Sequence, residues 1–79
     1  MEVDILTHVF HPVEAGQPYL VMASAFAAAG HSKLKDLGRS VRTHCLEDAK
    51  AQCEALTAAL REGVERAGWR VRSVAVKHG

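Results

Sequence analysis

The stretch LEDAKAQCEALTAALREGVERAGWRVRSVAV, residues 46–76, decides the fold of this chain of 79 residues. Its apolar residues recur at intervals of three and four, the spacing that places side chains on one face of an α-helix. Gly68 then stands where a left-handed residue commonly ends a helix. We therefore predict an amphipathic helix over residues 46–67 that leads directly into a C-terminal strand over residues 69–76. The predicted helical stripe comprises Leu46, Ala49, Cys53, Leu56, Leu60, Val64 and Ala67.

The ends of this helix and the following strand carry further signals. Glu47 and Asp48 in the first turn interact favourably with the positive end of the helix dipole. Trp69 follows the glycine and is expected to fold back on the last turn, in the core. The apolar positions of the final strand change face near Ser73. This change indicates either a β-bulge or a central strand that is covered on both faces.

The N-terminal half reads as a hairpin. Residues 3–10 contain β-branched residues in partial alternation with polar ones, which favours a half-buried strand. Residues 11–18 hold two prolines and a glycine and predict a loop. Tyr19 to Ala27 is apolar and could form a strand or an alanine-rich helix, and its length and the preceding loop favour the strand.

A third strand is predicted over Ser40 to His44, where Val41 and Thr43 alternate with polar residues. The alternative is a short helix over Ser32 to Arg42 with Ser32 as its N-cap. The expected order is therefore β-β-(β)-α-β. It describes an α+β protein in which one long helix packs on one face of an antiparallel or mixed sheet of three to four strands, with residues 1–79 forming one domain.

Length and composition limit the stability and the location of the protein. A chain of 79 residues rich in alanine forms a thin core, so self-association is an expected source of stability and we expect a homodimer. The longest apolar stretch, residues 19–29, is shorter than the roughly 20 residues of a membrane helix. The acidic N-terminus lacks a signal-peptide pattern, so we expect the protein in the cytoplasm, without a membrane partner.

Candidate metal and catalytic residues are too poorly spaced to define a site. His8 and His11 form a His-x-x-His pair, but the adjacent His44 and Cys45 do not easily aim both side chains at one ion or act as base and nucleophile. Cys45 and Cys53 are separated by about 12 Å of helix rise, which excludes a disulfide between them. No phosphate-binding glycine loop occurs. We expect no enzymatic activity, no metal and no cofactor.

Cations concentrate in two segments that bracket the helix. If these segments were neighbours in the sheet, their side chains would form one basic surface that attracts phosphate. Three strands followed by a helix, with cations on the sheet, resemble the DNA-reading arm domains of phage-type integrases over residues 19–60. The resemblance implies a nucleic-acid-binding module as the alternative function. The candidate residues are Lys33, Lys35, Arg39, Arg42, Arg70 and Arg72.

The preferred functional prediction is a protein-interaction or self-association module. One helix cannot cover four strands, and it packs on only one face of the sheet. The apolar residues of the opposite face are therefore exposed unless another chain covers them. Exposed apolar surface of this kind usually marks an interface with a second copy or another protein. The residues expected on it are Leu6, Phe10, Met22 and Phe26.

Overall fold

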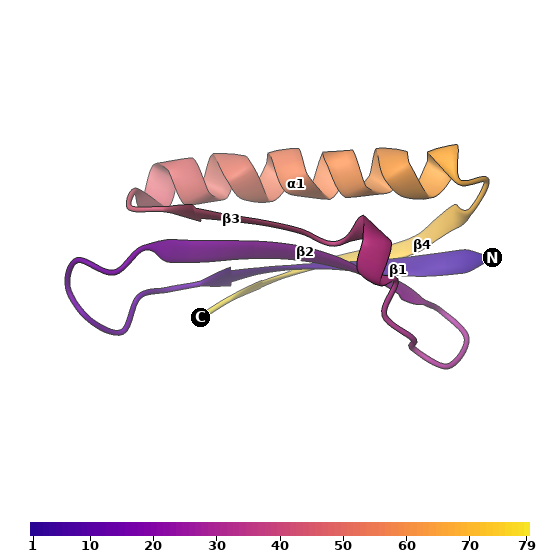
Figure 1. Cartoon of the computed structure of the whole chain (residues 1–79), viewed down its shortest axis with the longest axis horizontal. Coiled ribbons are helices and arrows are strands. Elements are labelled where there is room, and N and C mark those ends of the chain that lie inside the picture. Colours follow the sequence, from indigo (N-terminus) through magenta and orange to yellow (C-terminus); the bar gives the residue numbers. More distant parts are fainter.

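One long helix lies against a four-stranded sheet in the computed structural model, which describes all 79 residues (Figure 1). The elements are β1 (Glu2–Phe10), β2 (Tyr19–Ala27), the short 3-10 turn η1 (Lys35–Leu37), β3 (Arg39–Thr43), α1 (Leu46–Arg66) and β4 (Arg70–His78). The predicted α+β class and the element order are confirmed.

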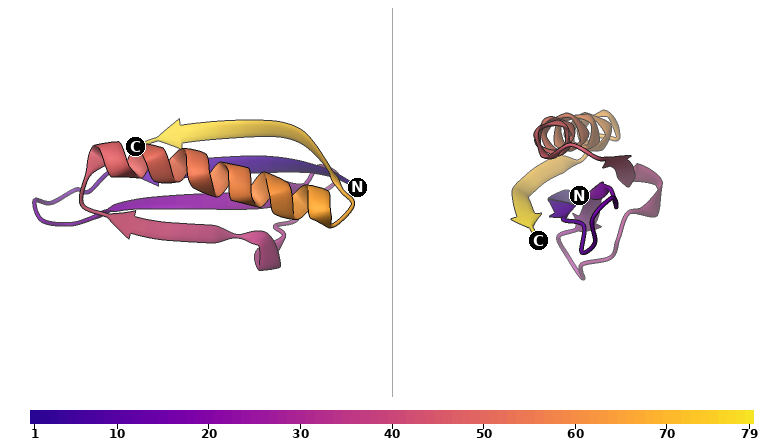
Figure 2. Two further views of the ribbon diagram at one scale, coloured as in Figure 1. Left: turned by 90° about the horizontal axis from the view of Figure 1, so that it is seen from above. Right: turned by 90° about the vertical axis from the view of Figure 1, so that its left-hand side faces the viewer.

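The sheet is mixed, with strand order β3-β2-β1-β4. β1 pairs antiparallel with β2, and β2 pairs antiparallel with β3. β4 pairs parallel with β1, because α1 carries the chain back along the sheet before β4 begins. Figure 2 shows, from above, that α1 crosses the middle of the sheet while β3 and β4 lie on its two sides.

The core lies between α1 and the central strands β1 and β2. Alternate residues of each strand point toward the helix and are buried, as the period of two in a strand requires. Small residues on β2, such as Ala23 and Ala25, let the helix lie close to the sheet. The two core clusters comprise Val3, Ile5, Ala23, Ala25, Leu60 and Val64, and Val9, Val21, Ala49 and Cys53.

A pair of threonines joins the helix to the sheet inside this core. Thr7 is the one buried polar residue, and its Oγ1 lies 2.6 Å from Oγ1 of Thr57 on α1. The Thr57 hydroxyl donates its hydrogen to the backbone oxygen of Cys53 at 2.7 Å. Thr7 must therefore be the donor to Thr57, and its buried hydroxyl is satisfied as burial requires.

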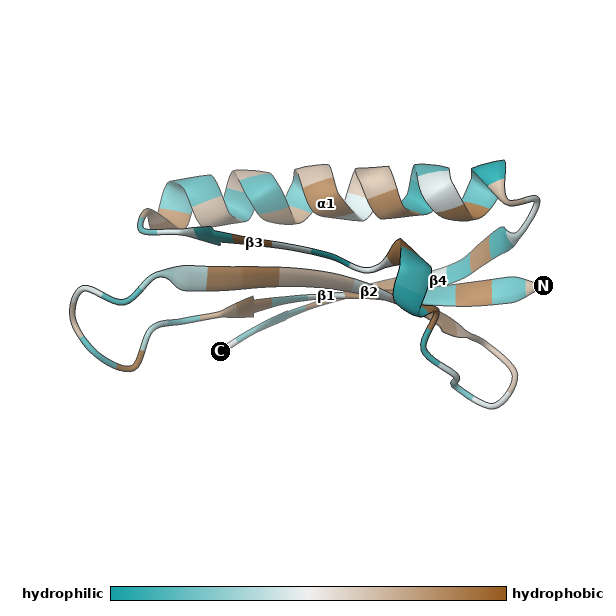
Figure 3. Cartoon of the chain, in the orientation of Figure 1, coloured by the Kyte–Doolittle hydropathy of each residue, from teal (hydrophilic) through white to brown (hydrophobic).

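The two ambiguous segments are strands. Tyr19–Ala27 pairs on both sides, which leaves no room for the helical alternative (Figure 3 shows that β2 is apolar along most of its length). Arg39–Thr43 is the predicted third strand, one residue earlier than expected. The helix considered over Ser32 to Arg42 is wrong, since only Lys35–Leu37 forms a turn of 3-10 helix there.

Both ends of α1 follow from local hydrogen bonds. At its start Cys45 makes no side-chain cap. Instead Oγ1 of Thr43 accepts the Cys45 backbone N–H at 3.4 Å and donates to the Asp48 carboxylate at 2.9 Å. At its end Gly68 has a φ of 84°, which glycine adopts readily. This turn lets the Trp69 backbone N–H bond to the Val64 oxygen at 3.1 Å, and Trp69 packs half-buried against the core as expected.

The predicted irregularity in the last strand is a β-bulge. Val71 pairs with Val3, but the next β1 residue, Asp4, pairs with Ser73, so Arg72 is the extra residue. The alternative of a central strand is wrong, because β4 lies at the edge of the sheet. The strand also extends to His78, two residues beyond the predicted end.

The helix of the chain is not long and apolar enough to cross a membrane.

The packing of the core predicts that substitutions at two positions on α1 change the free energy of unfolding by very different amounts. Leu60 is 1% exposed, so Leu60→Ala should lower the free energy of unfolding by about 2 to 5 kcal/mol. Ala51 is exposed on the opposite side of the helix, and Ala51→Lys should change this free energy by less than about 0.5 kcal/mol. Urea unfolding followed by circular dichroism measures both. Equal effects at the two positions would contradict this packing of α1.

Candidate functional site: the open face and free edge of the sheet

No helix or strand covers the face of the sheet opposite α1 (Figure 1). Residues that alternate with the buried ones point to this open face. Five large apolar side chains lie there, half-buried among their neighbours except for Phe10, which is 38% exposed. All four residues predicted for an uncovered face are among them, and Leu20 is an addition. The open face thus presents Leu6, Phe10, Leu20, Met22 and Phe26.

A histidine lies over one end of this apolar surface. The His8 ring stacks on Phe10 with 3.8 Å between ring centroids and 16° between planes. Its Nε2 lies 2.7 Å from the backbone oxygen of Gly79. Because a carbonyl oxygen only accepts, Nε2 carries a hydrogen and donates it. His8 therefore shields part of Phe10 and holds the end of β4 against β1.

The bulge in β4 builds a polar cluster on the other end of the open face. The Arg72 guanidinium donates to both carboxylate oxygens of Asp4, from Nε at 3.0 Å and from Nη2 at 2.6 Å. The Ser73 hydroxyl donates to the same carboxylate at 2.7 Å. The Arg72 hydrogen bonds first, and the Ser73 hydroxyl next, hold the pKa of Asp4 below its usual value. This cluster fixes the register of β4 on β1.

β4 forms a free edge whose apolar side chains are incompletely covered. Its valines on the helix side, Val74 and Val76, are 40% and 48% exposed, since α1 lies mainly over β1 and β2 (Figure 2). A hollow of about 330 Å³ lies between this edge and the helix, lined in part by Thr57, Ala58 and Val76. A long edge strand with apolar side chains is a template for pairing with another strand.

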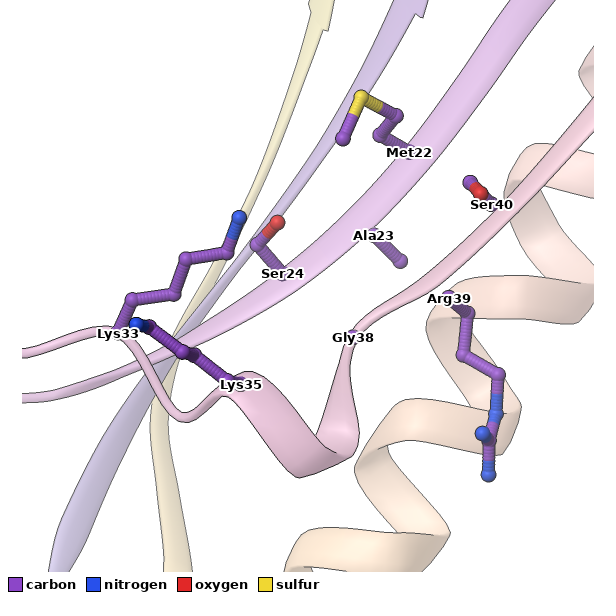
Figure 4. A pocket seen from close by; sticks show the side chains of 8 residues that line it. All are labelled: Met22, Ala23, Ser24, Lys33, Lys35, Gly38, Arg39 and Ser40. Carbon is purple, nitrogen blue, oxygen red and sulfur yellow. The ribbon is translucent and has the colours of Figure 1, made fainter.

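The first basic segment lies at the β3 side of the sheet. Lys33, Lys35 and Arg39 line a shallow hollow of about 300 Å³. The Lys33 side chain extends toward the Ser24 hydroxyl, Lys35 points toward the base of Lys33, and Arg39 points away from both (Figure 4). No carboxylate lines this hollow. Arg42 lies farther along β3, paired with Leu20. Three of the four cations in this segment therefore line one hollow.

The second basic segment lies at the opposite edge. Arg70 and Arg72 belong to β4, which is separated from β3 by both central strands. Arg72 is moreover bound to Asp4. The condition for a single surface of six cations, that the two basic segments be neighbours, is not met. The pattern of charge along the chain could not reveal this, because the strand order depends on the crossover through α1.

The histidines and cysteines singled out by the sequence are dispersed. His11 packs edge-on against Tyr19 and His78, with ring centroids 5.3 and 6.1 Å apart. No three His, Cys, Asp or Glu side chains are grouped so as to hold a metal ion. Both cysteines are free. Burial, and then the nearby Glu54 carboxylate, raises the pKa of the Cys53 thiol, so this thiol is protonated and a poor nucleophile at neutral pH.

Two features of this site escaped the sequence analysis. Asp4 carried no signal beyond its place in an alternating strand, since its partners follow 68 and 69 positions later. The exposure of Val74 and Val76 could have been suspected from their phase after the bulge, but it depends on β4 being an edge.

No known protein family, curated protein or solved structure matches this chain.

The Asp4 cluster predicts a defined pH dependence of stability. Because the pKa of Asp4 is lowered in the folded protein, its contribution is present above the ordinary Asp pKa of about 3.9 and is lost as the pH falls through the folded pKa. Asp4→Asn should therefore destabilise the protein at pH 7 and flatten the loss of stability on acidification. Thermal unfolding of both proteins between neutral and acid pH measures this. Parallel pH profiles would contradict it.

Proposed function

We propose that this chain is a non-catalytic, cytoplasmic protein-interaction module that self-associates through its sheet as a homodimer. The proposal is carried by the surface of the sheet that the single helix leaves uncovered. This surface comprises the apolar open face and the free edge strand β4. Apolar patches of this kind mark interaction sites in soluble proteins. Only 12 of the 79 residues are buried, so association would add burial that the isolated fold lacks.

Two further features support a role without catalysis in a reducing compartment. Both cysteines are free, as is usual where thiols are kept reduced. The buried Cys53 has a raised pKa, which makes its thiol a poor nucleophile at neutral pH. A partner protein could occupy the same apolar surface, and self-association is favoured because it requires no component besides this chain.

Self-association predicts the mass of the protein in solution. Light scattering or sedimentation at tens of micromolar should give twice the mass of one chain. The mass should be insensitive to added salt, because burial of apolar surface provides most of the stabilisation and is little affected by ionic screening. A monomer at every salt concentration would overturn the proposal.

Nucleic-acid binding is the second candidate, favoured by the hollow that holds Lys33 and Lys35. Two lysines in one hollow, with the Lys33 ammonium beside the Ser24 hydroxyl and no lining carboxylate, suit a backbone phosphate. The hollow is open and shallow, as a contact to a phosphate backbone requires. Arg70 and Arg72 lie too far around the sheet to contribute to the same contact.

This candidate predicts a specific loss of DNA affinity. Lys33→Ala combined with Lys35→Ala should weaken retention on a duplex-DNA column and reduce the slope of log affinity against log salt by about 1.8, the value for two phosphate contacts. The matched control is Arg70→Ala at the opposite edge, which should leave both quantities unchanged. If the unaltered protein is not retained at low salt, nucleic-acid binding is excluded as its function.

A further inference from the structure

We propose that β4 of one copy pairs antiparallel with β4 of a second copy about a two-fold axis at Ala75. The four strands of each copy then form one continuous sheet with both helices on the same side. This inference rests on the self-association proposed above, and it assigns the contact to the β4 edge. Its first support is the direction of the backbone groups along β4.

The backbone of β4 alternates between pointing at β1 and pointing outward. Gly79 donates its N–H to the Val9 oxygen at 2.9 Å, so the backbone N–H and C=O groups of residue 79 point toward β1. These groups alternate along a strand. Those of Ala75 therefore also point toward β1, while those of Val74, Val76 and His78 point away from the sheet. These outward groups have no strand beside them. A second strand can bond to them without any change in the fold.

This edge is already ordered in an extended conformation. From Ser73 to His78 the register with β1 is unbroken. The ends of the strand are tied as well, by the Arg70 N–H to the Met1 oxygen at 3.0 Å and by the His8 contact with Gly79. A partner strand therefore binds a preformed template, which lowers the entropy lost on association.

The side chains select the register centred on Ala75. In that register Val74 lies opposite Val76 of the second copy, and the symmetric pair repeats the contact. Each pair exchanges two backbone hydrogen bonds, and cross-strand β-branched pairs stabilise a sheet. These are the two valines that α1 leaves 40% and 48% exposed. At the centre, the two Ala75 residues face each other without exchanging backbone hydrogen bonds, the arrangement in which opposite Cα atoms lie closest. Their small side chains meet on the open face.

Charge agrees with this register. Lys77, which makes no ion pair within its own chain, lies opposite Ser73 of the second copy. That serine donates to Asp4 beside it, so the ammonium group approaches the carboxylate side of the Asp4–Arg72 ion pair. A register centred on Val74 would place the bulged Arg72 opposite Val76, within the ladder, whereas the register centred on Ala75 places Arg72 opposite His78, at the end of the ladder. The register centred on Ala75 confines its central pairs to the regular segment after the bulge.

Cross-linking tests the register directly. In a Cys45→Ser background, which removes the exposed native thiol, Ala75→Cys should form a disulfide between two copies under mild oxidation. The facing Cα atoms of such a closely spaced pair are about 4.5 Å apart, within the range that a disulfide spans. The matched control is Ala51→Cys, exposed on the far side of α1, which should stay largely monomeric on denaturing gels.

Substitution at the edge tests its energetic role. Val74→Lys with Val76→Lys should raise the dimer dissociation constant roughly tenfold or more, because cations would replace both apolar cross-strand pairs. Val13→Lys is the matched control, since Val13 is 90% exposed in a loop and should leave the dissociation constant unchanged. Circular dichroism verifies that each variant keeps its fold.

The outcomes separate this inference from the proposed function. A dimer that resists both edge substitutions, or that gives no more Ala75→Cys cross-link than the Ala51→Cys control, overturns edge pairing while self-association stands. An unaltered protein that is monomeric overturns both. Preferential cross-linking at position 75 together with loss of the dimer in the double variant establishes the β4 contact.

Discussion

The width of one helix against the width of four strands is the constraint on which the rest of the structure depends. An α-helix with its side chains is about 10 to 12 Å across, whereas the outer strands of a four-stranded sheet are roughly 14 Å apart between axes. Here α1 lies over β1 and β2, where Ala23 and Ala25 let it approach. The edge strands receive partial cover on one face, and the other face receives none.

This placement accounts for both the thin core and the exposed valines. Val3 and Ile5 on β1 are buried by α1, but Val74 and Val76 one strand away are exposed. The helix covers these valines only in part, because β4 lies toward the edge of its width. What stabilises β4 is its pairing with β1, reinforced by Asp4 with Arg72 and by His8 with the end of the strand. The edge is consequently well ordered and still unpaired on its outer side.

The same geometry separates the two basic segments. The crossover through α1 carries the chain from β3, at one edge, over the middle of the sheet to β4, at the other. Cations that bracket the helix in sequence therefore end at opposite edges, with Lys33 and Lys35 in one hollow and Arg70 on the far side. A parallel β1–β4 pairing requires such a crossover, so a joint basic surface is incompatible with this topology.

The sequence alone determined the elements whose signals are local. The stripe that includes Leu60 and Val64 fixed the helix, Gly68 fixed its end, and the change of phase near Ser73 located the bulge to within one residue. The sequence also predicted an open face with Leu6 and Phe10 on it, because alternation in a strand needs no knowledge of its neighbours.

Tertiary structure decided everything that depends on which strands are neighbours. Tyr19–Ala27 became a strand because β1 and β3 pair with it on both sides, although its alanines also suit a helix. The Asp4 cluster joins residues nearly 70 positions apart, and it exists only because β4 adds beside β1 and not beside β3. Strand order is set by the packing of α1 across the sheet, a long-range effect that no local pattern of residues encodes.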